Sequence, residues 1–171
     1  MDLKQKIRSV PDFPKKGILF RDITTLLNDA AGFAYVIEQL ARRYQDRPVD
    51  VVAGIEARGF IIGSAVAHQL KKGFVPVRKP GKLPAEKLSV SYSLEYGTDR
   101  VEMHTDAIVP GARVLMVDDL LATGGTMKAA CELVEKAGGE VVECAFVIHL
   151  ADLPGAQLLK KYNIFSLISY D

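Results

Sequence analysis

The sequence predicts an α/β fold with a mostly parallel sheet flanked by helices. Three observations support this prediction. Apolar runs of strand length alternate with stretches whose apolar residues recur at helical spacing. Residues 114–117, Val-Leu-Met-Val, are apolar at every position, as strands buried on both faces of a parallel sheet are. Pro48 and the pair Gly138 and Gly139 mark boundaries between segments.

The first regular element expected is a helix over residues 30–45, with Asp29 as its N-cap. Its apolar residues are spaced by three and four, at Phe33, Val36, Ile37, Leu40, Ala41 and Tyr44. A buried strand, a loop and a second helix are expected next, at residues 49–55, 56–59 and 60–72. Gly73 is expected to end that helix at its C′ position.

The later segments continue the alternation. Further strands are expected at residues 74–79, 113–117, 141–150 and 164–169. A helix to about residue 137 follows the second of these, and Asp152 and Pro154 open a short helix before the last. Because ligands bind at the carboxyl ends of parallel strands, the loops at 56–59 and 118–126 are the expected site.

The segment from 90 to 105 departs from this rhythm. Apolar residues alternate with serines and Glu95 over residues 90–96, which predicts a hairpin whose return strand is residues 100–105. A turn at Gly97 would place Glu95 opposite Arg100, where the two could form a cross-strand ion pair. Since a serine-rich hairpin has little to pack against, we expect a mobile lid.

Composition limits the class of protein. With 171 residues, the chain is long enough for one domain, expected to span residues 1–171. Its 22 basic and 21 acidic residues leave a net charge of +1, which gives no bias toward nucleic acid or membrane. Cys131 and Cys144 lie in apolar patterns and are expected to be buried free thiols. No apolar run approaches a membrane span, so we expect a cytoplasmic protein.

Residues 114–126 carry the strongest functional signal. After the apolar run come Asp118 and Asp119, and then small residues at Ala122, Thr123, Gly124, Gly125 and Thr126. Small residues let several backbone N–H groups converge on one anion at a helix N-terminus. The two carboxylates would repel a phosphate unless they face something else, such as the hydroxyls of a sugar. The pattern indicates a sugar-phosphate site; the alternative is a tight turn with an aspartate cap.

This run resembles the phosphoribosyl-pyrophosphate (PRPP) signature of type I phosphoribosyltransferases. Leu19-Phe20-Arg21-Asp22-Ile23 and Ser91-Tyr92-Ser93-Leu94-Glu95-Tyr96-Gly97 are similar to segments of the family members that act on adenine. The resemblance covers about residues 11–170. It implies the type I fold with the hairpin as a β-hairpin lid and a small N-terminal base-binding hood. It also implies a homodimer and a Mg²⁺ cofactor that PRPP and water hold, with no direct protein ligand.

The loop at 54–59 has the outer spacing of a Walker A motif, but Phe60 and Ile61 replace the lysine and hydroxyl residue that the motif needs. Arg58 can still meet an anion there, since a guanidinium suits a pair of phosphate oxygens. An arginine on a surface turn is the alternative. The resemblance implies a pyrophosphate-binding loop with a cis peptide just before Ala57, a position where relatives often have Ser or Asp.

A basic run follows the next strand, at Arg78, Lys79, Lys82 and Lys87. Such a run is either a solvated surface or a means to neutralise pyrophosphate. The resemblance favours Arg78 and Lys82 as pyrophosphate contacts, with Lys82 in its own subunit or reaching into the neighbour.

The resemblance assigns the base pocket to two segments. It implies that adenine lies between Phe20 and Leu120, while the carbonyl of Leu19 and the amide of Arg21 meet its edge. Adenine offers an N6 donor and an N1 acceptor, which one C=O and one N–H complement; hypoxanthine inverts both. Core packing is the alternative for Phe20. The resemblance also places Tyr96 at the substrate and Glu95 over the base, where Glu95 would manage the N9 proton.

The expected function is transfer of 5-phosphoribose from PRPP to N9 of adenine, which gives AMP and pyrophosphate in purine salvage. Glu95, Asp118 and Asp119 are the expected catalytic residues. One alternative is another purine as acceptor. A second is a non-catalytic PRPP sensor that regulates transcription, although residues 1–50 contain no basic recognition helix. His68 and His104 are expected to be structural, because neither has a second ligand at metal spacing. His149 ends a strand that could lie near the site, but it receives no role.

Overall fold

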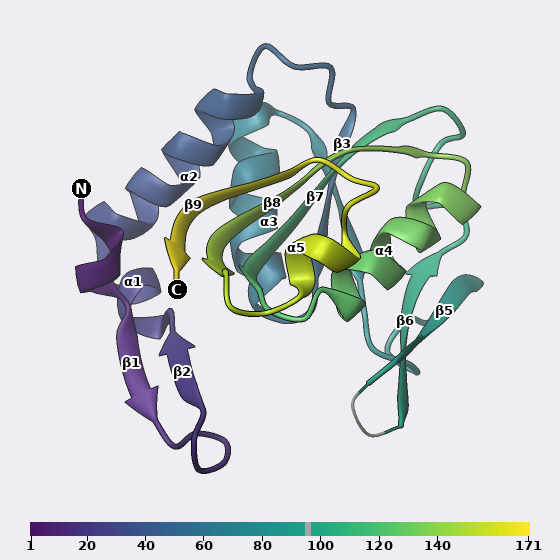
Figure 1. Cartoon of the computed structure of the whole chain (residues 1–171). Coiled ribbons are helices and arrows are strands. Elements are labelled where there is room, and N and C mark those ends of the chain that lie inside the picture. Colours follow the sequence, from purple (N-terminus) through teal and green to yellow (C-terminus); the bar gives the residue numbers. More distant parts are fainter. Residues whose placement is uncertain (95–96) are drawn as a thin grey trace.

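The computed structural model describes residues 1–94 and 97–171. Its centre is a five-stranded sheet in the order β4-β3-β7-β8-β9, with every neighbouring pair parallel (Figure 1). The strands are β3 (Val51–Ile55), β4 (Gly73–Val77), β7 (Arg113–Leu121), β8 (Glu140–Leu150) and β9 (Ile164–Tyr170). The predicted parallel α/β architecture is confirmed.

Helices cover both faces of this sheet. Helices α2 (Ala30–Tyr44) and α3 (Arg58–Leu70) pack on one face, and α4 (Gly125–Lys136) packs on the other, near the short α5 (Gly155–Leu158). Leu115 and Val117 of β7 belong to the α2 and α3 core, whereas Val114 and Met116 belong to the α4 core. This alternation between two cores is why the strand is apolar at every position. In the described part of the chain, no helix is long and apolar enough to cross a membrane.

Helix α2 begins as predicted, because the Asp29 carboxylate accepts a hydrogen bond from the Gly32 amide at 2.6 Å. Helix α3 differs from its prediction at both ends. It begins at Arg58, directly after a two-residue turn, and ends at Leu70. Lys71, with φ of 57°, takes the left-handed conformation predicted for Gly73, and its amide donates to the His68 carbonyl at 3.0 Å. Gly73 instead pairs with Val51 in the sheet.

Strand β7 runs four residues beyond its predicted end at Val117. Pairing with β8 continues as far as Leu121, which lies opposite His149. Asp118 and Asp119 are therefore strand residues, and the loop that follows is only residues 122–124. Residues 56–57 and 122–124 still lie at the carboxyl edge of the sheet, as predicted.

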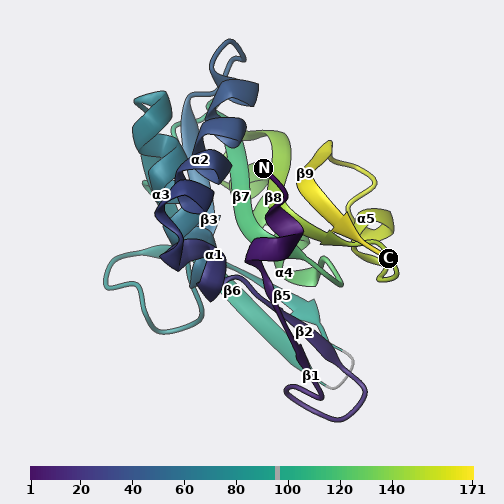
Figure 2. The same cartoon turned by 90° about the vertical axis from the view of Figure 1, so that its left-hand side faces the viewer.

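The N-terminal part contains elements that the sequence analysis missed. The 3-10 helix η1 (Leu3–Lys6) leads into an antiparallel pair, β1 (Arg8–Pro11) and β2 (Leu19–Asp22), and then α1 (Thr24–Asn28). In Figures 1 and 2 this hairpin extends beyond the edge where the sheet strands end. The loop predicted around Phe20 is wrong, because Phe20 pairs with Val10. Four-residue strands are too short to show a period of two.

The predicted second hairpin is confirmed as β5 (Lys87–Ser93) and β6 (Thr98–His104). Two details of the expectation are wrong: the residue opposite Arg100, and the lack of apolar surface for the hairpin to pack against. Its register places Arg100 opposite Ser91, and the ion pair of Arg100 within the described residues is with Glu102 at 3.4 Å. Its inner face is also well packed, since Val90, Val101 and Met103 are buried in the α4 core. The base of the hairpin is therefore part of the folded body, because tertiary packing supplied the apolar surface that local sequence could not reveal.

The two cysteines lie where predicted. Cys131 on α4 and Cys144 on β8 are buried free thiols with their sulfur atoms 3.5 Å apart. The hydrogen bond with Cys144, and next burial, raise the pKa of the Cys131 thiol.

Candidate active site

A small pocket of about 100 Å³ lies at the start of α4. It brings together the predicted cradle residues Ala122, Thr123, Gly124, Gly125 and Thr126, with Asp118, Leu120, Leu121, Met127 and Phe146 around them. The N-cap residue of α4 is Gly124, and no side chain of the described residues caps this helix. In α2, by contrast, the Asp29 carboxylate fills that role. The first-turn N–H groups of α4 and its dipole therefore favour an external anion at this pocket.

The cradle loop packs backbone against backbone on α5. Gly124 has a φ of 81°, and a Cβ atom built there would lie 2.9 Å from the Gly155 carbonyl oxygen. A Cβ built on Gly155 would lie 2.3 Å from the Ala122 carbonyl oxygen. Both positions require glycine, one for its backbone conformation and one for space. Gly155 could not be predicted as part of the site from the sequence, because its contact with the loop joins segments separated along the chain.

The two consecutive acids have different surroundings. Asp119 is buried, and its Oδ2 accepts a hydrogen bond from Nε of Arg58. Asp118 borders the cradle pocket, and its Oδ1 accepts the Asp119 amide at 2.9 Å. Burial, and next the negative charge of Asp119, raise the pKa of Asp118 well above its usual range. The pair therefore combines one acid neutralised by an arginine with one acid beside the pocket.

Arg58 opens α3 and lies between two parts of the site. It contacts Asp119, and it also lines a larger apolar pocket that contains Phe20. The surface-turn alternative for Arg58 is therefore wrong. Its neighbour Gly59 lets α3 approach β7, since a Cβ there would lie 2.8 Å from Oδ1 of Asp118.

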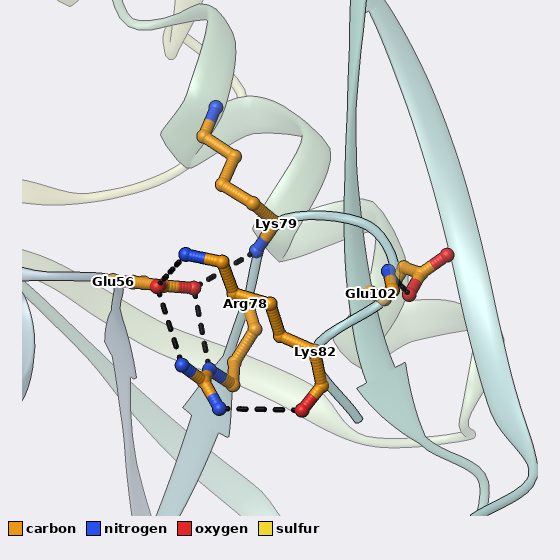
Figure 3. A network of polar contacts seen from close by, with 6 residues as sticks. Glu56, Arg78, Lys79, Lys82 and Glu102 are labelled. Carbon is orange, nitrogen blue, oxygen red and sulfur yellow. Dashed lines mark hydrogen bonds and ion pairs between the residues drawn. The ribbon is translucent and has the colours of Figure 1, made fainter. Parts of the chain in front are cut away.

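Two basic side chains and one backbone amide that follow β4 converge on one carboxylate, that of Glu56 (Figure 3). Arg78 donates from Nε and Nη2 to Oε2 and Oε1 at 3.2 and 3.3 Å. Lys82 donates from Nζ to Oε1 at 2.5 Å, and the Lys79 amide donates to Oε2 at 3.1 Å. Burial by itself would raise the pKa of Glu56, but these bonds outweigh it and lower the pKa to about 2.

This network shows that Arg78 and Lys82 are not free solvated charges. Arg78 and Lys82 are held by a carboxylate of their own chain, whereas Lys87 is exposed at the start of β5. The peptide bond between Glu56 and Ala57 is cis, as the resemblance implied. Sequence analysis missed Glu56, although its place between a buried strand and Arg58 was a usable signal.

A second network is centred on the hydroxyl of Tyr92. This oxygen accepts hydrogen bonds from Nζ of Lys79 at 2.9 Å and from Oγ1 of Thr126 at 3.0 Å, and it donates to Asp99 at 2.9 Å. Lys79 also forms an ion pair with Asp99. The lid hairpin, the basic loop and the cradle loop therefore meet at one hydroxyl. The period-two pattern assigned Tyr92 to the apolar face of the hairpin and gave no sign of these partners.

The apolar pocket next to Arg58 has a volume of about 460 Å³ and is lined by Val10, Phe13, Phe20, Asp22, Ile23, Thr24 and Arg58. Phe20 meets Phe13 edge to face, with ring centroids 5.2 Å apart. Core packing is therefore the wrong interpretation of Phe20, whose ring forms a pocket wall. Leu19 is exposed, and the Arg21 guanidinium lies 3.8 Å from the centre of the Tyr170 ring.

Leu120 borders the cradle pocket, whereas Phe20 lines the apolar pocket. Arg58, which lines the apolar pocket, donates to Asp119, the chain neighbour of the cradle residue Asp118. Glu95 and Tyr96 lie outside the described residues, and their roles stay predictions.

The donor set near the cradle determines what kind of metal site fits. Among residues 1–94 and 97–171, no three His, Cys, Asp or Glu side chains group closely enough to hold a metal. Beside the cradle stand Asp118 and Asp119, and Asp119 is engaged by Arg58. Mg²⁺ prefers phosphate oxygens and water to an all-protein cage. The residues therefore fit a magnesium ion that is bound mainly by phosphate oxygens.

The sheet, the uncapped helix and the paired acids define a phosphoribosyl transferase, and residues 22–170 match the phosphoribosyl transferase domain family. Adenine phosphoribosyltransferase of Chlorobium phaeovibrioides is 60% identical over 175 residues, which cover 100% of this chain and 99% of the relative. The chain therefore belongs to the adenine phosphoribosyltransferase family.

Solved structures agree with this assignment. The crystal structure of adenine phosphoribosyltransferase from Thermoanaerobacter pseudethanolicus has a TM-score of 0.96 and 54% identity, covering 99% of this chain and 98% of that one. The enzyme from Saccharomyces cerevisiae has a TM-score of 0.92 and 38% identity, covering 98% and 97%. That structure contains adenine and a dideoxy-imino-altritol bisphosphate.

Proposed function

We propose that this chain transfers 5-phosphoribose from PRPP to N9 of adenine and releases pyrophosphate and AMP. The observation that carries the proposal is the uncapped N-terminus of α4, which directly follows the strand that bears Asp118 and Asp119. A phosphate site beside two carboxylates suits a phosphorylated sugar. The adenine found in the yeast relative supports adenine as the acceptor.

In the proposed reaction, the amides of residues 123–126 hold the 5′-phosphate. The bond between C1′ and the pyrophosphate oxygen breaks, and its electron pair leaves with pyrophosphate. The ribose ring then carries positive charge, which Asp118 and Asp119 stabilise while they accept hydrogen bonds from the ribose hydroxyls. The burial of Asp119 supports this role, since charge interactions are stronger away from water.

Arg58, Arg78 and Lys82 are proposed to hold the leaving pyrophosphate. All three lie at the carboxyl edge of the sheet, on loops or helix starts that follow β3 and β4. When bound, Mg²⁺ would neutralise part of the pyrophosphate charge. PRPP oxygens and water would hold the ion, with Asp118 and Asp119 as the nearby carboxylates.

The acceptor base is proposed to bind beside Phe20, with Leu120 on its other face. The Leu19 carbonyl and the Arg21 amide would read N6 and N1 of adenine. A base that inverts donor and acceptor leaves two polar groups unpaired, which discriminates by roughly 10⁴ or more. N9 forms the new bond to C1′ and loses its proton, which Glu95 is proposed to manage; Tyr96 is assigned to the same lid segment.

Three further properties are part of the proposal. Residues 1–171 act as one domain, the active protein is a homodimer, and it works in the cytoplasm. The two buried free thiols support a reducing compartment. Light scattering on purified protein would test the dimer.

The decisive experiment measures pyrophosphate release from PRPP and Mg²⁺ with adenine, hypoxanthine, xanthine and guanine. Release with adenine and little with the others is expected. Preference for another base would contradict the specificity, and PRPP binding without release from any base would favour the sensor alternative. The double variant Asp118→Ala, Asp119→Ala provides the control and should lose both PRPP binding and turnover.

A further inference from the structure

We infer that Glu56 is an internal counter-anion of the pyrophosphate subsite. Its carboxylate binds Arg78 and Lys82 until pyrophosphate displaces it. The inference rests on the proposed function, because that function assigns these two cations to the leaving group. The inference adds a residue, Glu56, that competes with the product pyrophosphate for Arg78 and Lys82.

The hydrogen-bond geometry carries this inference. Arg78 directs Nε and Nη2 toward the two Glu56 oxygens, and its Nη1 donates to the Lys82 carbonyl at 3.3 Å (Figure 3). Lys82 places its ammonium on the same carboxylate, 2.5 Å from Oε1. The bidentate edge of the guanidinium is thus already occupied by an anion. Pyrophosphate must replace Glu56 to use that edge.

The backbone of the basic loop donates one amide to Glu56, that of Lys79 at 3.1 Å, but it also has anchors that do not involve Glu56. The Arg78 amide and carbonyl pair with Glu102 on β6, at 2.9 and 2.8 Å. The Glu102 carboxylate is buried and accepts the Gly81 amide at 3.1 Å. Since these contacts anchor both sides of the loop, neutralising Glu56 should release the two side chains without dismantling the loop.

Electrostatics gives the direction of the effect. The pKa of Glu56 lies at about 2, so the carboxylate is ionised near neutral pH. Its charge repels a multiply charged pyrophosphate and competes for the same donors. Glu56 therefore weakens pyrophosphate binding. It binds Arg78 and Lys82 again when pyrophosphate leaves, which favours product release.

The test compares pyrophosphate affinity in Glu56→Gln and wild-type protein by calorimetry, with inorganic pyrophosphate alone and with Mg²⁺. Glutamine keeps the shape and removes the charge. We expect about tenfold tighter binding, or about 1.4 kcal/mol. Asp50→Asn is the matched control and should bind pyrophosphate as wild type does. The Asp50 carboxylate also pairs with an arginine, Arg113, at 2.8 Å from both Nε and Nη2, but at the amino end of the sheet.

Unchanged or weaker binding by folded Glu56→Gln would overturn the inference, because a structural role alone cannot tighten binding. A measurement on wild-type protein covers the case in which this variant does not fold. The ¹⁵N signal of Arg78 Nε, identified by its loss in Arg78→Lys, should shift as pyrophosphate saturates; a signal that does not move rejects the exchange.

The two proposals fail in different ways. Wild-type protein that turns over PRPP and adenine, combined with no gain in Glu56→Gln, rejects only the counter-anion. Wild-type protein that neither binds pyrophosphate nor releases it from PRPP rejects the proposed function and this inference together.

Discussion

Replacement of Gly155 by alanine should damage PRPP binding without unfolding the protein. Gly155 does not line the cradle pocket, but it supports the loop that forms it. The new Cβ would lie 2.3 Å from the Ala122 carbonyl oxygen and 2.7 Å from Cδ1 of Leu121. Ordinary contact begins at 3.4 Å, so the loop or α5 must move by about 1 Å.

The size of that shift sets the expected effect. Overpacking of this kind costs about 1–3 kcal/mol of unfolding free energy, which most domains survive. A displacement of about 1 Å in a group that positions substrate costs about 10²-fold in rate. Because the nearest atom belongs to the loop backbone, the displacement should reach the amides that we propose hold the phosphate.

The assay is kcat/KM for PRPP, measured by pyrophosphate release at saturating adenine, together with calorimetric PRPP affinity and urea unfolding. Gly73→Ala is the matched control, since its Cβ would lie at an ordinary 3.7 Å from Val51 and at the amino end of β4. The control should keep wild-type activity. A folded Gly155→Ala protein with wild-type PRPP affinity would refute the reasoning that backbone contact with α5 shapes the cradle.

Three further predictions concern charge, base binding and stability. Since burial and the charge of Asp119 raise the pKa of Asp118, that carboxylate becomes protonated as pH falls through the raised value, and kcat/KM should fall on the acid side. Asp119→Asn removes one cause of the raised pKa of Asp118, so the acid limb of the kcat/KM profile should move to lower pH. An acid limb that stays in place would contradict this role of Asp118. Phe20→Ala should raise KM for adenine by roughly 10- to 100-fold and leave KM for PRPP unchanged, because base stacking on an aromatic ring contributes about 1–3 kcal/mol; an equal rise for both substrates would count against it. Glu143→Gln should lower the unfolding free energy by about 1.5–3 kcal/mol in urea titrations and spare kcat/KM. Glu143 is buried near the amino end of β8 and accepts hydrogen bonds from Arg43 at 2.7 and 3.0 Å, so a loss of activity at full stability would exclude a purely structural role.

The sequence predicted the central sheet well because a local residue pattern indicates each of its strands and flanking helices. The run at 114–117 and the N-cap at Asp29 required no knowledge of distant residues. The two N-terminal strands were missed because they are only four residues long, and the stability of such a pair depends on its surroundings. The end of α3 was misplaced because Lys71, a residue with no particular turn signal, takes the left-handed conformation.

The candidate site was predicted unevenly for the same reason. The cradle at 122–126 is contiguous in sequence, so its chemistry could be read directly. Glu56, the Tyr92 hydroxyl and Gly155 act through partners far away in the chain, and no local pattern records such partners. The basic run was recognised, but its counter-anion was not, because Glu56 lies on a different strand-to-helix connection.

The sequence by itself determined the order of strands and helices from α2 onward, the cradle loop with its two acids, and the family. These features depend on residue type and spacing within a short stretch, where backbone geometry decides which side chains are neighbours. Only the tertiary structure decided which charges pair: Arg58 with Asp119, and Arg78 and Lys82 with Glu56. Ion pairs depend on distances between elements, and the parallel sheet sets those distances when it brings the ends of β3, β4 and β7 to one edge.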